Sequence, residues 1–257
     1  MILTPENRIK DYTAKGWWGT DTLYSLFIAA CEESGDSEAL VDAPNRREFT
    51  LGDPRRLNFN QIKTEVDRYA SIFYDAGFRK DDKVVLQLPN IVELAILYIA
   101  LSKIGIIISP VPIQYGKYEI AKIIDDIKPK GYIGIASFNS KNFAEGIRDA
   151  FNNEHILFSV GDADGFININ NKAFGEDSLA DTDAYTQSIT NSANDILTIC
   201  WTSGTTGTPK GVPRSHNLWI TMAKAAYHLA NTQKGDILLN PFPLVNICLL
   251  YTSPSPR

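Results

Sequence analysis

The chain alternates between apolar runs that fit strands and amphipathic stretches that fit helices. Apolar positions repeat at intervals of three and four residues in the helical stretches, whereas short runs rich in Val and Ile indicate buried strands. The predicted helices are 22–31, 58–76, 91–104, 117–127 and 140–151. The predicted strands are 38–41, 83–88, 106–111, 131–136, 155–160 and 196–201.

The order of these elements predicts the fold class. Strands and helices alternate with short links from residue 83 to residue 160, which predicts an α/β fold with mainly parallel sheets covered by helices. The stretch 91–104 is apolar on nearly every side, so we expect it to be buried all round. Residues 42–54 fit a loop or hairpin, and the Asp-, Asn-, Ser- and Thr-rich stretch 161–194 fits a long surface connection.

Composition narrows the class of protein. With 25 Lys and Arg against 30 Asp and Glu, the net charge is −5, which speaks against a general nucleic-acid binder. Cys31, Cys200 and Cys248 are far apart and show no zinc-ligand spacing, so we expect free thiols in a reducing compartment. The N-terminus lacks a signal-peptide pattern and charges interrupt the most apolar stretch. We therefore expect a cytoplasmic protein without a transmembrane segment.

The segment Thr202–Gly211, TSGTTGTPKG, carries the candidate chemistry. Glycines let the backbone approach a ligand, hydroxyl groups donate hydrogen bonds to phosphate oxygens, and Lys210 adds a mobile positive charge. The segment follows a predicted strand and precedes a helix that we expect to start at Ser215. It is not a Walker A loop, because Lys210 stands between Pro209 and Gly211. These residues favour polyphosphate binding, while a Gly/Thr-rich turn without a ligand is the alternative.

This loop resembles the signature of the AMP-binding, acyl-adenylate-forming superfamily. The stretch LPNIVELAILYIALSKIGIIISPVPIQYGKYEI upstream is also similar to that family. The resemblance covers roughly residues 15–247 and implies an incomplete N-terminal domain of the adenylate-forming fold. It also implies ATP, Mg²⁺ and coenzyme A as cofactors, a small carboxylic acid as substrate, and a possible carrier-protein partner.

The resemblance assigns roles to particular residues. Thr202 would lie near the magnesium ion as well as the nucleotide. The residues that the resemblance places on the ATP phosphates are Thr202, Ser203, Gly204, Thr205, Thr206, Gly207 and Lys210. In the following segment, Asn240-Pro-Phe-Pro-Leu-Val-Asn246, Asn246 stands where this family more often has His in the acyl pocket. Asn246 would bind an oxygenated substrate or satisfy a local turn. His216 would approach the nucleotide or complete a helix cap.

The resemblance also sets expected boundaries. We expect residues 1–247 to form a partial N-terminal AMP-binding domain, residues 248–257 to be a non-native tail, and the C-terminal domain with its catalytic Lys to be absent, so that the catalytic residue is unknown. The implied reaction is acyl-adenylate formation followed by thioester formation with coenzyme A, in which this fragment alone is inactive. The alternatives are an aryl-acid ligase that loads a carrier-protein thiol, a luciferase-like oxygenase, and a truncated non-catalytic nucleotide-binding module.

Overall fold

A seven-stranded sheet organises the computed structural model, which describes residues 1–172, 175–202 and 209–245. The strand order is β11-β10-β4-β3-β5-β8-β9; β10 and β11 run antiparallel, and all other neighbours run parallel. The strands are β3 (Lys83–Leu86), β4 (Ile107–Pro110), β5 (Gly131–Ile135), β8 (Ile156–Val160), β9 (Ile167–Asn168), β10 (Ile196–Thr202) and β11 (Lys210–Ser215). This sheet confirms the predicted α/β class.

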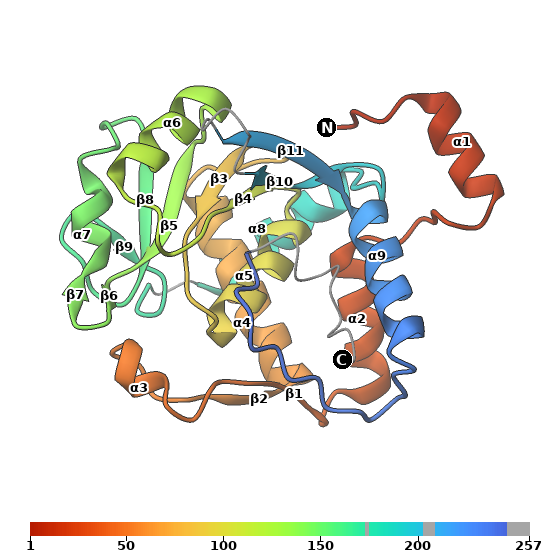
Figure 1. The fold of residues 1–257 in the computed structure, drawn as a ribbon, viewed down its shortest axis with the longest axis horizontal. Helices are drawn as coiled ribbons and strands as arrows, with labels where there is room; N and C mark the ends of the chain where they lie inside the picture. The colour runs from red at the N-terminus through yellow and green to blue at the C-terminus, as the bar shows by residue number, and fades with distance from the viewer. Residues whose placement is uncertain (173–174, 203–208, 246–257) are drawn as a thin grey trace.

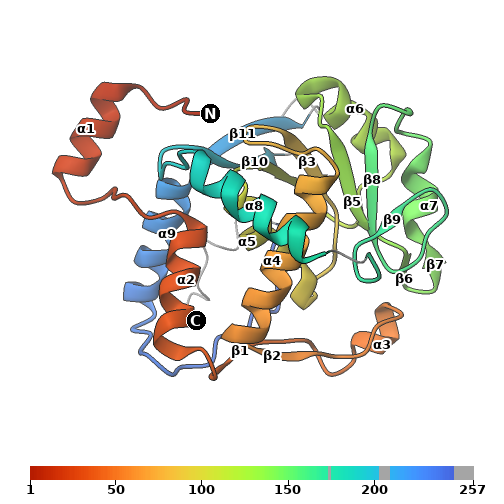
Figure 2. The same cartoon turned by 180° about the vertical axis from the view of Figure 1, so that it is seen from behind.

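Helices cover both faces of the sheet (Figures 1 and 2). On one face lie α2 (Leu23–Ser34), α4 (Phe59–Asp75), α5 (Val92–Lys103) and α8 (Glu176–Ser188), and on the other lie α6 (Lys117–Ile127) and α7 (Phe143–Arg148). Helix α9 (His216–Leu229) follows β11 and lies beside α2, and α1 (Glu6–Ala14) projects from the body. A small antiparallel sheet pairs β1 (Glu38–Val41) with β2 (Arg56–Asn58), and α3 (Arg46–Phe49) lies in its connection.

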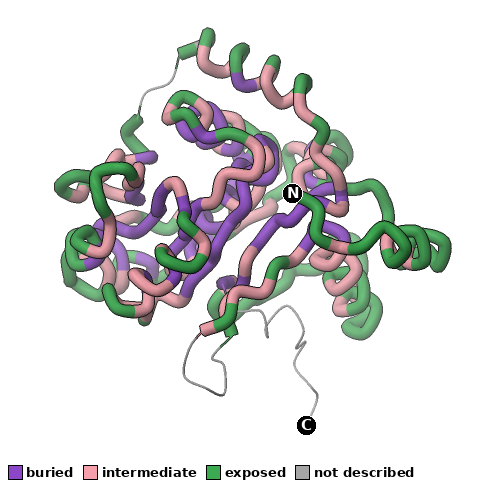
Figure 3. The backbone as a smooth tube through the Cα atoms, turned by 90° about the horizontal axis from the view of Figure 1, so that it is seen from above, coloured by how far each residue is buried: buried purple, intermediate pink, exposed green. Residues whose placement is uncertain are grey.

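The apolar core consists of two clusters, one on each face of the sheet, because successive side chains of a strand point to opposite faces. Val84 and Leu86 of β3 point into the larger cluster with α4 and α5, whereas Val85 points into the smaller cluster with α6 and α7. Successive strand side chains face opposite sides of a sheet, so a strand that is apolar at every position needs cover on both faces. Figure 3 shows the buried backbone concentrated along the sheet and the helices next to it.

Helix α5 is buried on nearly all sides, as its sequence predicts. Its charged residue Glu93 is 1% exposed and is paired with the buried Arg46 of α3, with 2.9 Å between Arg46 Nη2 and Glu93 Oε1. Asp42 joins the same group, since its Oδ2 accepts from Arg46 at 2.6 Å and its Oδ1 accepts from the Val92 amide at 2.9 Å. This ion-pair group fastens the β1–β2 arm to the start of α5.

Helix α4 has clear start and stop signals. The Asn58 side chain accepts from the Gln61 amide at 2.8 Å, and the Gln61 side chain accepts from the Asn58 amide at 2.9 Å, which is a reciprocal cap. Its buried face includes Ile62, Val66 and Phe73. The chain leaves the helix at Gly77, whose φ of +86° suits glycine. The predicted helix 58–76 is therefore confirmed to within a residue at each end.

The stretch 161–194 is more structured than the expected surface connection. Strand β9 joins the sheet beside β8, and α8 packs against α4. Polar contacts hold α8 in place, since Lys103 of α5 donates to Asp183 at 2.6 Å and the Lys80 amide donates to the Tyr185 hydroxyl at 2.6 Å. Because α8 is held by polar contacts to distant residues, its sequence lacks the apolar repeat from which a helix is predicted.

The predicted helix 140–151 is also corrected. Only α7 is helical there, and a short hairpin precedes it, formed by β6 (Ser137–Phe138) and β7 (Lys141–Asn142). Asn139 and Ser140 adopt positive φ at the turn of this hairpin, a backbone conformation that Asn tolerates better than most residues. The turn therefore delays the start of the helix.

Two simpler expectations have direct outcomes. Cys31 and Cys200 are free and buried, as expected for cysteines that act as small apolar residues, and Cys248 lies outside the described residues. Within the described residues, no helix combines the length and apolar character needed to cross a membrane.

Candidate functional site

The Gly/Thr-rich segment connects two antiparallel strands at the edge of the sheet. Thr202 ends β10, Lys210 begins β11, and the two residues are paired and exposed. Because β10 runs parallel to β4, this end of the hairpin lies at the carboxyl edge of the sheet, where open α/β sheets bind ligands. The other residues predicted to bind the nucleotide lie outside the described residues: Ser203, Gly204, Thr205, Thr206 and Gly207.

Strand β11 was not predicted from the sequence, and it connects the segment to the next helix. The helix starts at His216, one residue after the predicted position, but a six-residue strand comes before it. Gly211 and Pro213 lower the strand propensity of this stretch. Pro213 is tolerated because β11 is the edge strand of the sheet, where a missing N–H leaves no ladder bond unmade on the open side.

Trp201 supports the base of the hairpin. Its indole Nε1 donates to the Ser109 hydroxyl at 2.8 Å, which ties β10 to β4. A Cβ atom added at Gly211 would lie 3.0 Å from Ile199 and 3.2 Å from the Trp201 ring. Gly211, the last residue of the motif, therefore lies where β11 packs tightly against β10. These contacts fix the end of the hairpin next to Thr202 and Lys210.

A buried glutamine fixes the neighbouring loop at the same edge of the sheet. The Gln87 side chain donates to the carbonyl oxygens of Pro112 and Tyr115, both at 2.9 Å, and accepts from the Tyr132 hydroxyl at 2.8 Å. Gln87 and Tyr132 are fully buried, and burial raises the pKa of the Tyr132 phenol well above its usual value. The sequence analysis missed this cluster, because one Gln after an apolar strand carries no periodic signal.

The segment predicted to line the acyl pocket is anchored by Asn90. Its Oδ1 accepts from the Leu244 amide at 2.8 Å, and its Nδ2 donates to the Phe242 carbonyl oxygen. Asn90 follows β3, so these bonds bring the segment to the carboxyl edge of the sheet. Val245 is buried in the main core, and Asn246, the predicted substrate residue, lies outside the described residues.

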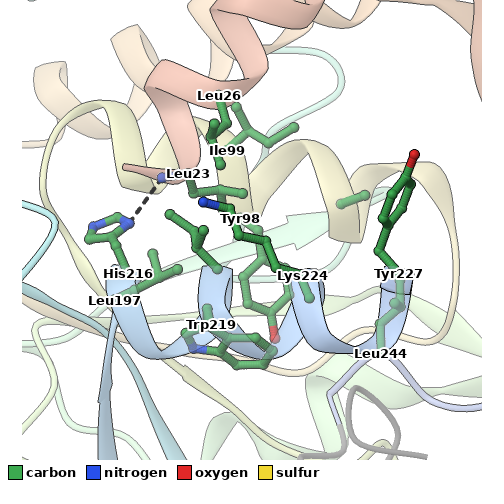
Figure 4. A pocket seen from close by; sticks show the side chains of 13 residues that line it. Leu23, Leu26, Tyr98, Ile99, Leu197, His216, Trp219, Lys224, Tyr227 and Leu244 are labelled. Carbon is green, nitrogen blue, oxygen red and sulfur yellow. Dashed lines mark hydrogen bonds between the residues drawn. The ribbon is translucent and has the colours of Figure 1, made fainter. Parts of the chain in front are cut away.

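An apolar cavity of about 520 Å³ opens beside this segment (Figure 4). It lies between α2, α5 and α9, and its size is within the usual range of small-molecule pockets, about 300–1,000 Å³. Its lining residues are Leu23, Leu26, Ala95, Tyr98, Ile99, Leu197, His216, Trp219, Ile220, Ala223, Lys224, Tyr227 and Leu244. Leu244 is the point where the predicted acyl segment reaches the cavity.

His216 forms one end of this cavity and is not next to the nucleotide loop. Ser215, its neighbour, pairs with Ile196, whereas Lys210 pairs with Thr202 at the opposite end of the hairpin. The His216 Nδ1 accepts from the Leu23 amide at 3.1 Å, and burial lowers its pKa to about 4, so the ring is neutral at pH 7. The helix cap comes from Ser215, whose hydroxyl accepts from the Leu218 amide at 3.2 Å.

The described residues offer little for a metal ion by themselves. No group of three His, Cys, Asp or Glu residues in the described part of the chain could hold one. Thr202, the predicted metal-side residue, is exposed and pairs with Lys210 across the hairpin. A lone hydroxyl fits Mg²⁺, because Mg²⁺ keeps several waters and binds substrate phosphates with few protein ligands.

The fold and the base of the hairpin define an α/β domain that presents Thr202 and Lys210 at the carboxyl edge of its sheet. The sequence model of the AMP-binding enzyme family matches residues 27–253. The chain therefore belongs to the AMP-binding enzyme family, as the loop motif predicted.

Curated relatives extend this result. The chain is 27% identical over 241 residues to a crotonobetaine/carnitine–CoA ligase of Salmonella paratyphi A, a match that covers 93% of this chain and 45% of the relative. It is 22% identical over 239 residues to a medium-chain fatty-acid–CoA ligase of Escherichia coli, which covers 93% of this chain and 41% of the relative. The chain thus spans less than half the length of these ligases.

Solved structures support the fold independently. The apo structure of Mycobacterium smegmatis MbtA superposes with a TM-score of 0.79 over 96% of this chain and 43% of that protein, at 21% sequence identity. At this identity the likeness concerns the fold alone. It agrees with the observed arrangement of a mainly parallel sheet between layers of helices.

Proposed function

We propose that this chain is part of an enzyme that uses ATP to activate a carboxylic acid as an acyl-adenylate and then passes the acyl group to coenzyme A. The observation that carries the proposal is the hairpin of an AMP-binding family member, which presents Thr202 and Lys210 at the carboxyl edge of the sheet. The similarity to two acid–CoA ligases supports the choice of reaction.

In the first step a carboxylate oxygen attacks the α-phosphorus of ATP, and the bond to the pyrophosphate oxygen breaks. Negative charge builds up on the phosphate oxygens, so the reaction depends on positioning and charge neutralisation. Lys210 is exposed at the start of β11, and a lysine ammonium there would pair with a phosphate of the nucleotide. Mg²⁺, held mainly by the phosphates with Thr202 nearby, would supply further neutralising charge.

In the second step a thiol attacks the carbonyl carbon of the acyl-adenylate, and AMP leaves. Coenzyme A is the acceptor that the similar ligases favour, and a carrier-protein thiol would react in the same way. The loop 112–116 follows β4 at the carboxyl edge of the sheet, and β4 is the neighbour of β10. The Gln87 side chain holds this loop through the carbonyl oxygens of Pro112 and Tyr115.

Calorimetric titration with Mg²⁺–ATP tests the proposal. We expect Lys210→Met to weaken ATP binding on the order of 10- to 100-fold, because it removes charge-assisted hydrogen bonds. The matched control is Lys141→Met, an exposed lysine in β7, which should leave the affinity unchanged. Equal affinity in both variants would contradict the proposed role of the hairpin.

Acid-dependent exchange of pyrophosphate into ATP tests the chemistry itself. In a full-length ligase that contains this chain, we expect exchange that requires a carboxylic acid and decreases in Lys210→Met. ATP binding without exchange in any acid would instead support a nucleotide-binding module.

A further inference from the structure

A second, polar cavity of about 220 Å³ lies at the carboxyl ends of β5 and β8. Its lining includes Ile135 and Val160, the last residues of these two parallel strands. Residues 50–52 of the β1–β2 connection and three asparagines between residues 168 and 171 complete the lining. Strands β3 and β4 stand between β5 and β10 in the sheet. The polar cavity is therefore separate from the nucleotide hairpin, although both lie at the edge where open α/β sheets bind ligands.

The β1–β2 arm forms a fixed wall of the polar cavity. The Phe49 carbonyl oxygen accepts from the Asn139 amide at 3.0 Å, which ties the arm to the turn between β6 and β7 (Figures 1 and 2). Arg46 lines the cavity, is 3% exposed and is paired with Asp42 and Glu93. Because two carboxylates already face this guanidinium, Arg46 brings no uncompensated positive charge into the cavity.

Hydrogen bonds also fix the asparagine wall. The Tyr69 hydroxyl donates to Asn170 Oδ1 at 3.1 Å. Asn168 Nδ2 donates to Asp162 Oδ1 at 2.6 Å, and Asn168 Oδ1 accepts from the Asn170 amide at 3.0 Å. These side chains are held in place without a ligand, so a ligand would bind with a smaller loss of side-chain entropy.

Other polar groups in the lining are left for a ligand. Within the described part of the chain, the Ser137 hydroxyl, the Asn171 side-chain amide and Asn170 Nδ2 have no hydrogen-bond partner. A hydroxyl both donates and accepts, and a side-chain amide carries two donor hydrogens and one acceptor oxygen. A ligand that satisfies all three must present donors and acceptors close together, as neighbouring hydroxyl groups of a sugar or polyol do. Among the described residues that line the cavity none is aromatic, so a flat heterocycle would find no ring to stack on.

The charges of the lining favour an uncharged ligand. An anion would approach the Asp162 carboxylate and would compete with Asp42 and Glu93 for Arg46. A cation would find one exposed carboxylate, which already accepts from Asn168, and would face the Arg46 guanidinium. A neutral ligand avoids the cost of taking a charge out of water without a free partner.

We propose that the polar cavity binds a small uncharged polyhydroxy molecule, a monosaccharide or polyol, through the Ser137 hydroxyl and the side-chain amides of Asn170 and Asn171. A volume of about 220 Å³ equals the liquid volume of roughly seven water molecules, so the occupant is no larger than a single sugar unit. The site is independent of the proposed adenylation, because its lining includes neither Thr202 nor Lys210.

NMR titration of the 257-residue chain with glycerol, D-ribose and D-glucose tests the site directly. The side-chain amide signals of Asn170 and Asn171 should shift and saturate, with dissociation constants of about 1 mM or above for a few neutral hydrogen bonds. D-Gluconate is similar in size to glucose but carries a negative charge, so it should bind at least roughly tenfold more weakly than glucose. Signals that shift with none of the three neutral ligands, or gluconate that binds as tightly as glucose, would overturn the proposal.

Two leucine variants locate the ligand. Asn171→Leu removes a side-chain amide from the lining, so the affinity for the sugar should fall roughly 2- to 10-fold. Asn153→Leu is the matched control, because it replaces an exposed asparagine that does not line the cavity, and it should leave the affinity unchanged. Circular dichroism establishes that both variants fold.

Ser137→Ala is a smaller change that provides the test even if Asn171→Leu does not fold. It removes only a hydroxyl group, and the affinity for the sugar should again fall roughly 2- to 10-fold. A folded Ser137→Ala variant that binds the sugar as tightly as the parent would place the ligand elsewhere and reject the site.

The Lys210→Met variant separates the two proposals. It should bind the sugar as the parent does while its affinity for ATP falls. Sugar binding in a parent chain that does not bind ATP would retain the polar cavity as a site and reject the proposed function. ATP binding without any response to the sugars would do the reverse.

Discussion

Helices α5 and α9 line the same cavity, yet they meet their surroundings in opposite ways. Nine of the twelve residues of α5 are buried, because α2, α4 and the sheet surround it (Figure 1). In α9 only His216 and Asn217 are buried, although the helix carries many apolar residues. An apolar sequence therefore does not by itself establish burial; the number of packed neighbours decides it.

The difference continues in the polar residues of the two helices. In α5, the buried Glu93 and Lys103 must have partners, and Arg46, Asp67 and Asp183 provide them. In α9 the polar side chains after the first turn are at least partly exposed to water. Mutations in α5 should therefore disturb the whole fold, whereas mutations after the start of α9 should act locally.

The largest effect is expected at Glu93. Glu93→Ala would leave the Arg46 guanidinium buried without its partner on α5, and removal of one member of a buried ion pair costs about 3–5 kcal/mol of stability. Urea denaturation would measure this change. Glu6→Ala in α1, where the Glu6–Lys10 pair is exposed, should change the unfolding free energy by less than about 0.5 kcal/mol. Equal losses in the two variants would contradict the contrast between buried and exposed ion pairs.

A smaller, pH-dependent effect is expected at His216, where α9 begins. Burial lowers its folded-state pKa to about 4, while an unfolded His titrates near about 6.5. Above pH 6.5 both states are neutral and the group has no effect. As the pH falls from 6.5 to 4 the unfolded state takes up the proton first, so stability falls by roughly 3 kcal/mol.

The measurement is the unfolding free energy of the parent and of His216→Gln at several pH values between 7 and 4. The parent should lose more stability on acidification, and the difference should level off below about pH 4. Parallel pH profiles would mean that His216 is exposed or protonated in the folded state.

The smallest effect on stability is expected after α9. Ile237, Leu238 and Leu239 are 96, 86 and 84% exposed, so replacing all three with Ser should change the unfolding free energy by less than about 0.5 kcal/mol for each residue. A run of exposed apolar residues promotes association. Light scattering should therefore show less self-association in the triple variant, and no change in association would mean that these side chains make no contact between molecules.

The parts of the fold that could be predicted are those held by local apolar patterns. Strands β3 to β5 and helices α4 to α6 followed the expected boundaries closely, because their apolar repeats match the cover that they receive. Strand β11 and helix α8 were missed for two different reasons. Pro213 speaks against a strand in β11 unless the strand is known to lie at the edge of the sheet. Helix α8 depends on Asp183 and Tyr185, which contact residues some 80 to 105 positions earlier in the chain.

The candidate site also has one part that could be predicted from the sequence and another that could not. The chemistry of the loop could be predicted from the sequence because hydroxyl residues, glycines and Lys210 occur within ten consecutive positions. The Gln87 cluster and the cavity draw single residues from distant segments, and no spacing along the sequence relates Gln87 to Tyr132 or Leu23 to His216. Only the fold brings them together.

The attachment of the β10–β11 hairpin has a consequence for local motion. Within the described residues, β10 and β11 share a ladder from Ile196 to Thr202, whereas β10 meets β4 in register at the single pair Thr198↔Ile108. The Trp201–Ser109 bond is a second tie. Strand β10 is nevertheless buried through Leu197, Thr198 and Cys200, whereas β11 is the edge strand and is mostly exposed or half-buried. The amide protons of β11 should therefore exchange with solvent by local opening away from β10, before those of the central strands.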